Sequence, residues 1–452
     1  MDILFISLGC DKNLVDSEVM LGLIREKGYR ITSEEKTADI IVVNTCCFIS
    51  DAKEESINTI LEMAEYKKNG NLKGLIVTGC LAQRYKEDIQ NEIPEVDAVL
   101  GTSSYDEIVT VIDSVLEGNR TVRMKELDYF PDKKANRINT TGGCFSYLKI
   151  AEGCDKHCTY CIIPSLRGTY RSVPMERLLE EAKVLAEGGI KELILVAQET
   201  TLYGKDIYGE KALPKLLKGL CRIEGLEWIR ILYCYPEEIT DELIEVIKSE
   251  SKICRYLDMP VQHASDSVLK RMGRRTTKDE LVTIIRKLRT EIPDISIRTT
   301  LITGFPGESA DDHEELTEFV KEMHFERLGV FTYSKEEDTP AAKMKNQIRR
   351  HIKKQRQAEL MEIQQEIAFE KARTMKGRKL KVMIEGKLPE EEREAPADLP
   401  DTDKVFIGRT YMDAPNVDGY IFVRTDAELM SGEFVDVLVT GAKDYDLIGE
   451  LI

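Results

Sequence analysis

Three closely spaced cysteines are the residues of this chain whose type and spacing most clearly predict chemistry. They are Cys154, Cys158 and Cys161, in the segment GCDKHCTYC at residues 153–161. Thiolates bind iron–sulfur clusters and zinc, and three are one fewer than a closed cubane cluster or a structural zinc site requires. Either a fourth ligand lies elsewhere, or one iron stays open to bind another molecule. We call these cysteines the loop triplet.

Zinc is the competing interpretation of the loop triplet. His157 would be the fourth ligand, but it directly precedes Cys158, and ligation by two adjacent residues is strained. The close C-x-x-C spacing favours a cubane cluster, because one loop then binds two of its irons. Tyr160 would present an aromatic surface and backbone groups to a cofactor bound there.

A second set of cysteines follows predicted buried strands near the start of the chain. Cys10, Cys46 and Cys80, the sheet triplet, come just after Ile3–Leu8, Ile40–Val43 and Leu75–Thr78. Because the carboxyl ends of parallel strands share one sheet edge, the three thiols should converge there. Strand position alone does not decide between Cys46 and the adjacent Cys47. The remaining cysteines show no such placement and are expected to be small apolar core residues: Cys47, Cys144, Cys221, Cys234 and Cys254.

The elements that must position these cysteines alternate between strands and helices. Residues 1–117 predict a parallel α/β domain, with helices over Ser17–Lys27 and Lys53–Lys67 between its strands. Residues 118–142 are rich in turn formers and predict a linker. Six further strand–helix units lie within residues 143–370, which predicts a partial (β/α)6 barrel, since a full barrel has eight units.

The predicted barrel strands carry polar residues at their carboxyl ends, where ligands bind in such barrels. Gln198, Glu199 and Thr200 follow the second strand, and the segment Gly304–Glu308 follows the fifth. The second segment is equally well explained as a tight turn that starts a helix. His263, after the fourth strand, is as consistent with a structural role as with a catalytic one.

The last part of the chain predicts a long helix and a small β-domain. The helix spans Asn346–Thr374, and its basic start is typical of a solvated face, with docking of an acidic partner as the alternative. Residues 373–452 then predict a small antiparallel β-barrel, with an acidic, proline-rich loop over Pro389–Asp403.

Composition limits the class of protein. The 452 residues are 42% hydrophobic and 32% charged, with a net charge of −17, which is typical of a globular protein and unfavourable for broad nucleic-acid binding. The apolar runs are too short to span a bilayer, and the first residues lack a basic leader. We therefore expect a cytoplasmic protein without membrane contact, whose eleven cysteines serve metal binding or catalysis rather than disulfides.

The loop triplet after a first barrel strand resembles that of the radical S-adenosylmethionine (SAM) enzymes. The resemblance implies that the open iron binds SAM, and that one electron splits SAM to a radical that takes hydrogen from an unactivated carbon. We then expect SAM to be bound near the residues Tyr160, Gln198, Glu199, Thr200, Gly304 and Glu308.

The whole chain resembles one subfamily, the methylthiotransferases, which join a three-cysteine domain, a radical SAM barrel and a C-terminal TRAM β-barrel. The contexts LGC, NTC and TGC around Cys10, Cys46 and Cys80 match that first domain, and the family pattern selects Cys46 over Cys47. The resemblance implies two 4Fe-4S clusters and two SAM molecules. It also implies a reductant and a sulfur source as further partners.

Two substrates compete within the subfamily: a tRNA adenosine, and the β-carbon of an aspartate in the twelfth protein of the small ribosomal subunit. The segments SLGCDKNLVDSE (7–18) and GCDKHCTYCIIP (153–164) resemble the protein-modifying branch, although that branch commonly has Asp where Glu199 stands. Residues 377–452 carry 9 basic and 17 acidic residues, 9 − 17 = −8, which suits a basic protein better than tRNA. An iron–sulfur electron carrier without turnover is the alternative from another class.

Overall fold

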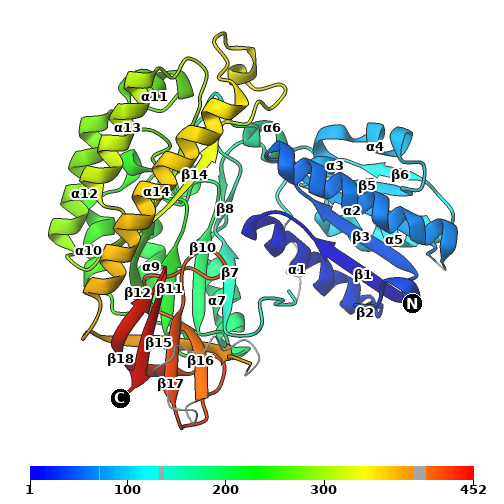
Figure 1. Ribbon diagram of the computed structural model, residues 1–452. Helices are drawn as coiled ribbons and strands as arrows, with labels where there is room; N and C mark the ends of the chain where they lie inside the picture. Colours follow the sequence, from blue (N-terminus) through cyan, green and yellow to red (C-terminus); the bar gives the residue numbers. More distant parts are fainter. Residues whose placement is uncertain (71, 132–136, 390–403) are drawn as a thin grey trace.

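The computed structural model describes residues 1–70, 72–131, 137–389 and 404–452. They form an N-terminal domain, a central domain and a C-terminal barrel (Figure 1). The N-terminal domain lies beside the central one, and the C-terminal barrel lies below it in this view. Most of the predicted loop at Pro389–Asp403 falls outside the described residues.

The N-terminal domain is a six-stranded parallel sheet in the order β2-β1-β3-β4-β5-β6. Helices cover both of its faces, because the central strands β3 and β4 are buried along their whole length. The strands are β1 (Asp2–Ser7), β2 (Arg30–Thr32), β3 (Ile40–Thr45), β4 (Gly74–Gly79), β5 (Ala98–Leu100) and β6 (Thr121–Arg123). The helices are α1 (Asp11–Glu26), α2 (Ser50–Asn69), α3 (Cys80–Tyr85), α4 (Glu87–Glu92) and α5 (Ile108–Leu116), with 3-10 turns η1 (Glu35–Thr37) and η2 (Tyr105–Glu107).

Strand β6 lies inside the segment 118–142 that the sequence predicts as a linker. It pairs with β5 through residues 121–123, so the start of that segment belongs to the first sheet. Residues 132–136 of the segment are outside the described part of the chain.

The central domain is a six-stranded parallel sheet in the sequential order β7-β10-β11-β12-β13-β14. Because each strand is added on the same side of the strand before it, the sheet curves into part of a barrel, as predicted. The main strands are β7 (Phe145–Lys149), β10 (Glu192–Val196), β11 (Trp228–Ile231), β12 (Ile253–Asp258), β13 (Ser296–Thr303) and β14 (Arg327–Thr332), and a small hairpin adds β8 (Ala151–Glu152) and β9 (Arg171–Ser172).

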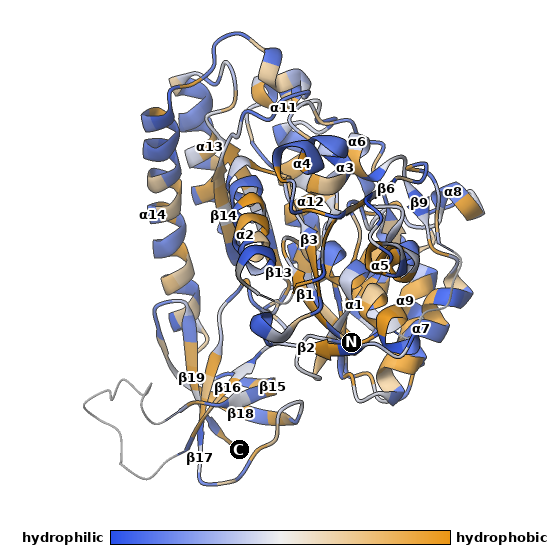
Figure 2. Ribbon diagram, turned by 90° about the vertical axis from the view of Figure 1, so that its right-hand side faces the viewer, coloured by the Kyte–Doolittle hydropathy of each residue, from blue (hydrophilic) through white to orange (hydrophobic). Residues whose placement is uncertain are grey.

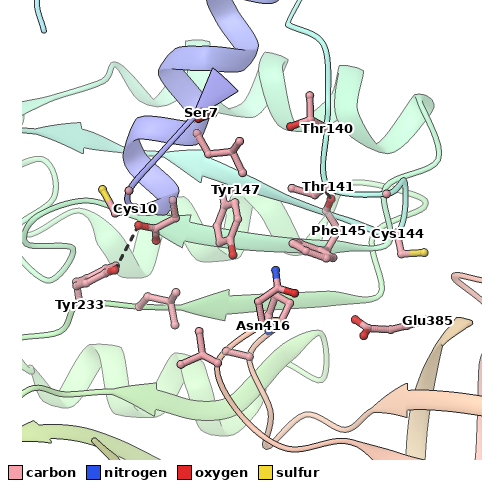
Figure 3. A pocket seen from close by; sticks show the side chains of 18 of the residues that line it. Ser7, Cys10, Thr140, Thr141, Cys144, Phe145, Tyr147, Tyr233, Glu385 and Asn416 are labelled. Carbon is pink, nitrogen blue, oxygen red and sulfur yellow. Dashed lines mark hydrogen bonds between the residues drawn. The ribbon is translucent and has the colours of Figure 1, made fainter. Parts of the chain in front are cut away.

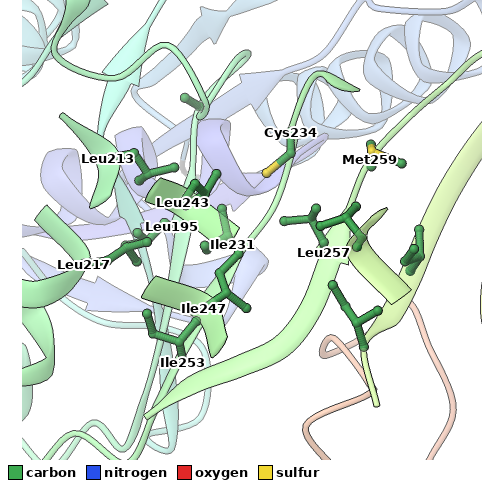
Figure 4. Close-up of a cluster of buried hydrophobic side chains, with 14 of the residues drawn as sticks. Leu195, Leu213, Leu217, Ile231, Cys234, Leu243, Ile247, Ile253, Leu257 and Met259 are labelled. Atoms are coloured by element: carbon green, nitrogen blue, oxygen red, sulfur yellow. The ribbon is translucent and has the colours of Figure 1, made fainter. Parts of the chain in front are cut away.

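Most helices of this domain cover the convex face of the sheet, whereas α6 (Ile163–Arg167) packs on α3 of the N-terminal domain. The other helices are α7 (Met175–Glu187), α8 (Lys205–Tyr208), α9 (Leu213–Cys221), α10 (Asp241–Ser249), α11 (Asp266–Met272), α12 (Lys278–Glu291), α13 (Ala310–Met323) and α14 (Arg350–Thr374), with 3-10 turns η3 (Pro236–Glu238) and η4 (Pro340–Lys343). Strand residues such as Leu195, Ile231 and Leu257 pack against them in one buried apolar cluster (Figure 4).

Helix α14 packs along β14 and α13. Its exposed side is polar along most of its length (Figure 2), in agreement with a solvated charged face. It begins at Arg350, later than the predicted start at Asn346, because Asn346 has a left-handed φ of 59°. None of the described helices has the length and apolar character needed to cross a membrane.

The C-terminal domain is a closed five-stranded barrel in the order β15-β16-β17-β19-β18. Its strands are β15 (Lys379–Lys387), β16 (Lys404–Arg409), β17 (Ile421–Thr425), β18 (Phe434–Lys443) and β19 (Asp446–Leu451). Four of the pairings are antiparallel, and β17 with β19 is parallel.

Two arginines fasten this barrel to the central domain. Arg409 donates to Glu192 of β10 at 2.6 Å, and Arg230 of β11 donates to the other oxygen of the same carboxylate at 2.7 Å. All three side chains are fully buried. Because a buried carboxylate is stable only when paired, this bridge fixes the barrel against the starts of the central strands.

Candidate iron–sulfur and substrate site

The sheet triplet lies at the carboxyl ends of three neighbouring strands. Cys10 caps α1 after β1, Cys46 follows β3, and Cys80 is the first residue of α3 after β4. Since β1, β3 and β4 are adjacent in the sheet, the structure brings the three predicted cysteines to one edge.

The backbone around the sheet triplet is closely packed. Gly9 has a φ of +92°, and a side chain there would place its Cβ 2.7 Å from Cys46 Cβ and 3.1 Å from Cys46 Sγ. Asn13 ties two of the loops together, because its amide donates to the carbonyls of Leu8 at 2.6 Å and Thr45 at 3.3 Å. These contacts hold the Cys10 and Cys46 loops side by side.

The thiols of the sheet triplet interact electrostatically. Burial, together with the nearby Cys80 thiol, raises the pKa of Cys46 to about 12, and burial also raises the pKa of Cys80. Cys47 is fully buried in an apolar cluster that also contains Cys80. The other excluded cysteines Cys144, Cys221, Cys234 and Cys254 also contact apolar clusters, and Figure 4 shows Cys234 among leucines.

The loop triplet lies between β8 and α6. Its loop is anchored to the far side of the barrel, since the backbone of Thr159 donates to Met272 at 2.8 Å and accepts from Ala341 at 2.9 Å. Burial raises the pKa of Cys154 to about 11 and that of Cys161 to about 12, and the neighbouring cysteines of the triplet add to both shifts. The three thiols therefore form one group.

No group of three His, Cys, Asp or Glu side chains in the described part of the chain is placed to hold a single metal ion. Thiolates of a cubane cluster bind different irons and stand farther apart than ligands of one zinc ion.

Aromatic and cationic side chains surround the loop triplet. Tyr235 Oη is 3.9 Å from Cys158 Sγ, and the Arg274 guanidinium lies 4.3 Å from the centre of the Tyr235 ring. Tyr160 is half-buried, with its ring 6.4 Å from Phe305 in a T-shaped arrangement. Among the described residues, Arg274 Nε and Nη1 have no hydrogen-bond partner, so they remain free to donate to a ligand.

Two predicted SAM residues at the end of β10 also keep free acceptor atoms. Within the described part of the chain, Gln198 Oε1 and Glu199 Oε2 are buried without a hydrogen bond. Glu199 Oε2 is 3.8 Å from the ammonium of Lys156, and burial raises the pKa of Glu199 to about 7. Such acceptors suit a ligand that carries an ammonium or hydroxyl group, as SAM does.

The other predicted SAM residues are engaged within the protein. Thr200 donates its hydroxyl to the carbonyl of Leu232 at 2.7 Å and so joins the ends of β10 and β11. The Glu308 carboxylate accepts from the Phe305 amide at 2.9 Å and from Arg356 of α14 at 2.6 Å. Gly304 lies against the side chain of Lys353.

A cavity of about 720 Å³ lies where the three domains meet. Cys10 of the sheet triplet opens into it, opposite Tyr147 and Tyr233 from the concave face of the central sheet (Figure 3). The loop 414–417 of the C-terminal barrel closes one wall, and Figure 3 shows Asn416 pointing inward. Arg298 of β13 also lines the cavity and pairs with Asp258 at 2.9 Å.

Several lining residues were not predicted from the sequence. Tyr233 follows β11, so the strand-end rule that identified Gln198 would also have found it. Arg298 is the one charged residue in strand β13, which is itself a signal. The loop 414–417 carries no such pattern.

Three family models match the chain, one for each part of the fold. They are the uncharacterized protein family UPF0004 at residues 2–101, the radical SAM superfamily at 148–320 and the TRAM domain at 376–452. The ribosomal protein uS12 methylthiotransferase RimO of Lachnoclostridium phytofermentans is 73% identical over 99% of both chains. The chain belongs to the RimO family of methylthiotransferases. It is thus a transferase of the radical SAM superfamily, and the resemblance inferred from its cysteine motifs is confirmed.

More distant relatives agree with this assignment. RimO of Clostridioides difficile (strain 630) is 48% identical over 99% of this chain and 98% of its own. Among solved structures, the radical SAM methyltransferase TsrM of Kitasatospora setae, with cobalamin and a [4Fe-4S] cluster bound, has a TM-score of 0.54. It is 14% identical and covers 75% of this chain and 76% of its own, so it supports the fold alone.

Proposed function

We propose that this chain methylthiolates the β-carbon of an aspartate in ribosomal protein uS12, with two 4Fe-4S clusters and two SAM molecules. The observation that carries the proposal is the 73% identity to a RimO protein over 99% of both chains. The acidic C-terminal barrel supports a basic protein as the substrate rather than tRNA. Because the substrate belongs to the ribosome, we place the reaction in the cytoplasm.

We assign one cluster to each triplet. The loop triplet would hold the cluster that binds SAM, and the sheet triplet would hold the auxiliary cluster. When bound, the first cluster and SAM supply a radical that takes hydrogen from an unactivated carbon.

The free acceptors near β10 orient SAM in this proposal. Gln198 Oε1 and Glu199 Oε2 accept from its ammonium or hydroxyl groups, and Tyr160 packs against it. Thr200, Gly304 and Glu308 shape the same rim, and Thr200 and Glu308 act by fixing strand ends because their side chains are already engaged.

The cavity between the three domains is the site for the target side chain. Arg298 is placed to attract the carboxylate of an aspartate, and Cys10 brings the auxiliary cluster to the same space. The electron and the inserted sulfur come from partners outside this chain.

The test compares substrates. The enzyme is reconstituted anaerobically with iron and sulfide, reduced, and incubated with SAM and either purified uS12 or unmodified tRNA. We expect 5′-deoxyadenosine release and a methylthio mass increase on an aspartate of uS12. A mass increase on tRNA alone would refute the substrate, and reduction without SAM cleavage would favour an electron carrier.

Cysteine variants test the cluster assignment. Alanine at all three positions of the loop triplet should abolish SAM cleavage and leave about half of the iron, since one of two equal clusters remains. Alanine at the sheet triplet should spare SAM cleavage and stop sulfur insertion. Unchanged iron in the second variant would contradict two clusters.

A further inference from the structure

Arg167 reaches from the central domain to the sheet triplet of the N-terminal domain. It ends α6, shortly after the loop triplet, and only 2% of the residue is exposed. Its guanidinium donates to Asn13 Oδ1 at 3.0 Å and to Asp16 Oδ2 at 2.6 Å, both on α1. A third contact joins it to Glu152 Oε2 at 3.2 Å in its own domain.

These contacts place the guanidinium at the edge of the first sheet. Asn13, which it binds, is the residue that ties the Leu8 and Thr45 carbonyls beside Cys10 and Cys46. Helix α6 also packs on α3, which begins at Cys80, and Leu166 shares a buried cluster with Cys80. The Arg167 guanidinium also interacts electrostatically with the Cys80 thiol.

The charges around Arg167 are balanced. Asp16 and Glu152 are two buried anions, and Lys149 and Arg167 are two buried cations that pair with both of them. Removal of the guanidinium charge would leave this group with one net negative charge beside the thiolates. Little water is present to screen that charge, so its effect would be large.

We propose that Arg167 is a positioning residue that raises the reduction potential of the auxiliary cluster from the neighbouring domain. This inference rests on the proposed function, in which the sheet triplet holds that cluster. A cation beside the ligands stabilises the reduced cluster, because reduction adds a negative charge, and net charge is a main determinant of such potentials. One segment, residues 154–167, thus serves both clusters.

The experiment isolates the auxiliary cluster. In the full chain, alanine replaces the loop triplet, and Arg167→Gln or Arg167→Lys is added. The midpoint potential is then measured by a dithionite titration followed by electron paramagnetic resonance, together with iron content. Arg137→Gln is the matched control, because Arg137 of the segment 118–142 makes a buried pair with Glu18 of α1 at 2.6 Å and has no contact with the sheet triplet in the described structure.

In Arg167→Gln we expect the ratio of reduced to oxidised cluster at a fixed potential to fall at least tenfold, which is about 59 mV for one electron. Arg167→Lys and Arg137→Gln should stay near the parent protein. If Arg167→Gln loses its iron, retention of iron in Arg167→Lys still supports the need for a cation at this position. Loss of iron in both variants overturns the inference. An unshifted potential in Arg167→Gln, or an equal shift in Arg137→Gln, also overturns the inference.

The two proposals fail in different ways. A parent protein without iron would refute the auxiliary cluster, and the role of Arg167 with it. A parent protein that keeps iron, combined with an unshifted Arg167→Gln, would refute the role of Arg167 alone.

Discussion

Replacing Gly9 by alanine should displace Cys46 and remove the auxiliary cluster. The Cβ of alanine would lie 2.7 Å from Cys46 Cβ, whereas carbon atoms in contact are about 3.5–4.0 Å apart, so one of the two must move by roughly 1 Å. Two costs add: about 1–2 kcal/mol for a left-handed backbone and about 1–3 kcal/mol for overpacking.

Gly28→Ala separates the two costs. Gly28 has a φ of +93°, close to the +92° of Gly9, but nothing lies within 4 Å of its Cβ position. This variant should therefore lose about 1–2 kcal/mol of stability from backbone strain alone and keep its full iron content.

The assays are iron and sulfide quantitation after anaerobic reconstitution, and urea unfolding followed by circular dichroism. Gly9→Ala should lose about half of the iron, the share of one of two equal clusters. It should also unfold at lower urea than Gly28→Ala. Full iron content in Gly9→Ala, with stability equal to that of Gly28→Ala, would show that Cys46 is not held at the cluster by this packing.

Two further predictions concern the buried charges. Glu192→Gln should lower the free energy of unfolding in urea by about 3–5 kcal/mol, because it leaves two buried arginines less well compensated. The control Glu187→Gln, at an exposed ion pair, should change the free energy of unfolding by less than about 1 kcal/mol. Equal effects of the two variants would refute the stabilising role of the Glu192 bridge. Burial lowers the pKa of His263 to about 3 from 6.5, so the unfolded state takes up a proton first and stability falls as pH drops below 6.5. Between pH 6.5 and 5 this loss of stability is about 2 kcal/mol. When unfolding is measured at both pH values, the loss should vanish in His263→Gln. It should persist in the control His351→Gln, at an exposed histidine.

The sequence predicted the parts of the site that depend on local pattern. Strands β1, β3 and β4 are continuous apolar runs, and the cysteines that follow them converge because parallel strands end at one edge. The same rule placed Gln198 and Glu199 on the rim of the central sheet. In each case a short segment carries both the element and the reactive residue.

What the sequence could not predict depends on contacts between distant segments. Strand β6 has three residues at a sheet edge, too few for any periodicity, and the parallel pairing of β19 with β17 is set by closure of the barrel. The cavity requires a fixed arrangement of three domains. That arrangement depends on buried pairs such as Arg409 with Glu192 and Arg167 with Asp16, which leave no local pattern in the chain.

The closing of the cavity by the loop 414–417 limits how freely the C-terminal module can be exchanged. A barrel connected to the central domain only through helix α14 could be replaced by the barrel of any relative, because it would contribute no residue to the cavity. Here the module supplies both a wall of the cavity and the partner of a buried carboxylate. A chimaera should therefore carry over Arg409 and this loop together, and under the proposed function we expect exchange of the loop alone to change the choice of target.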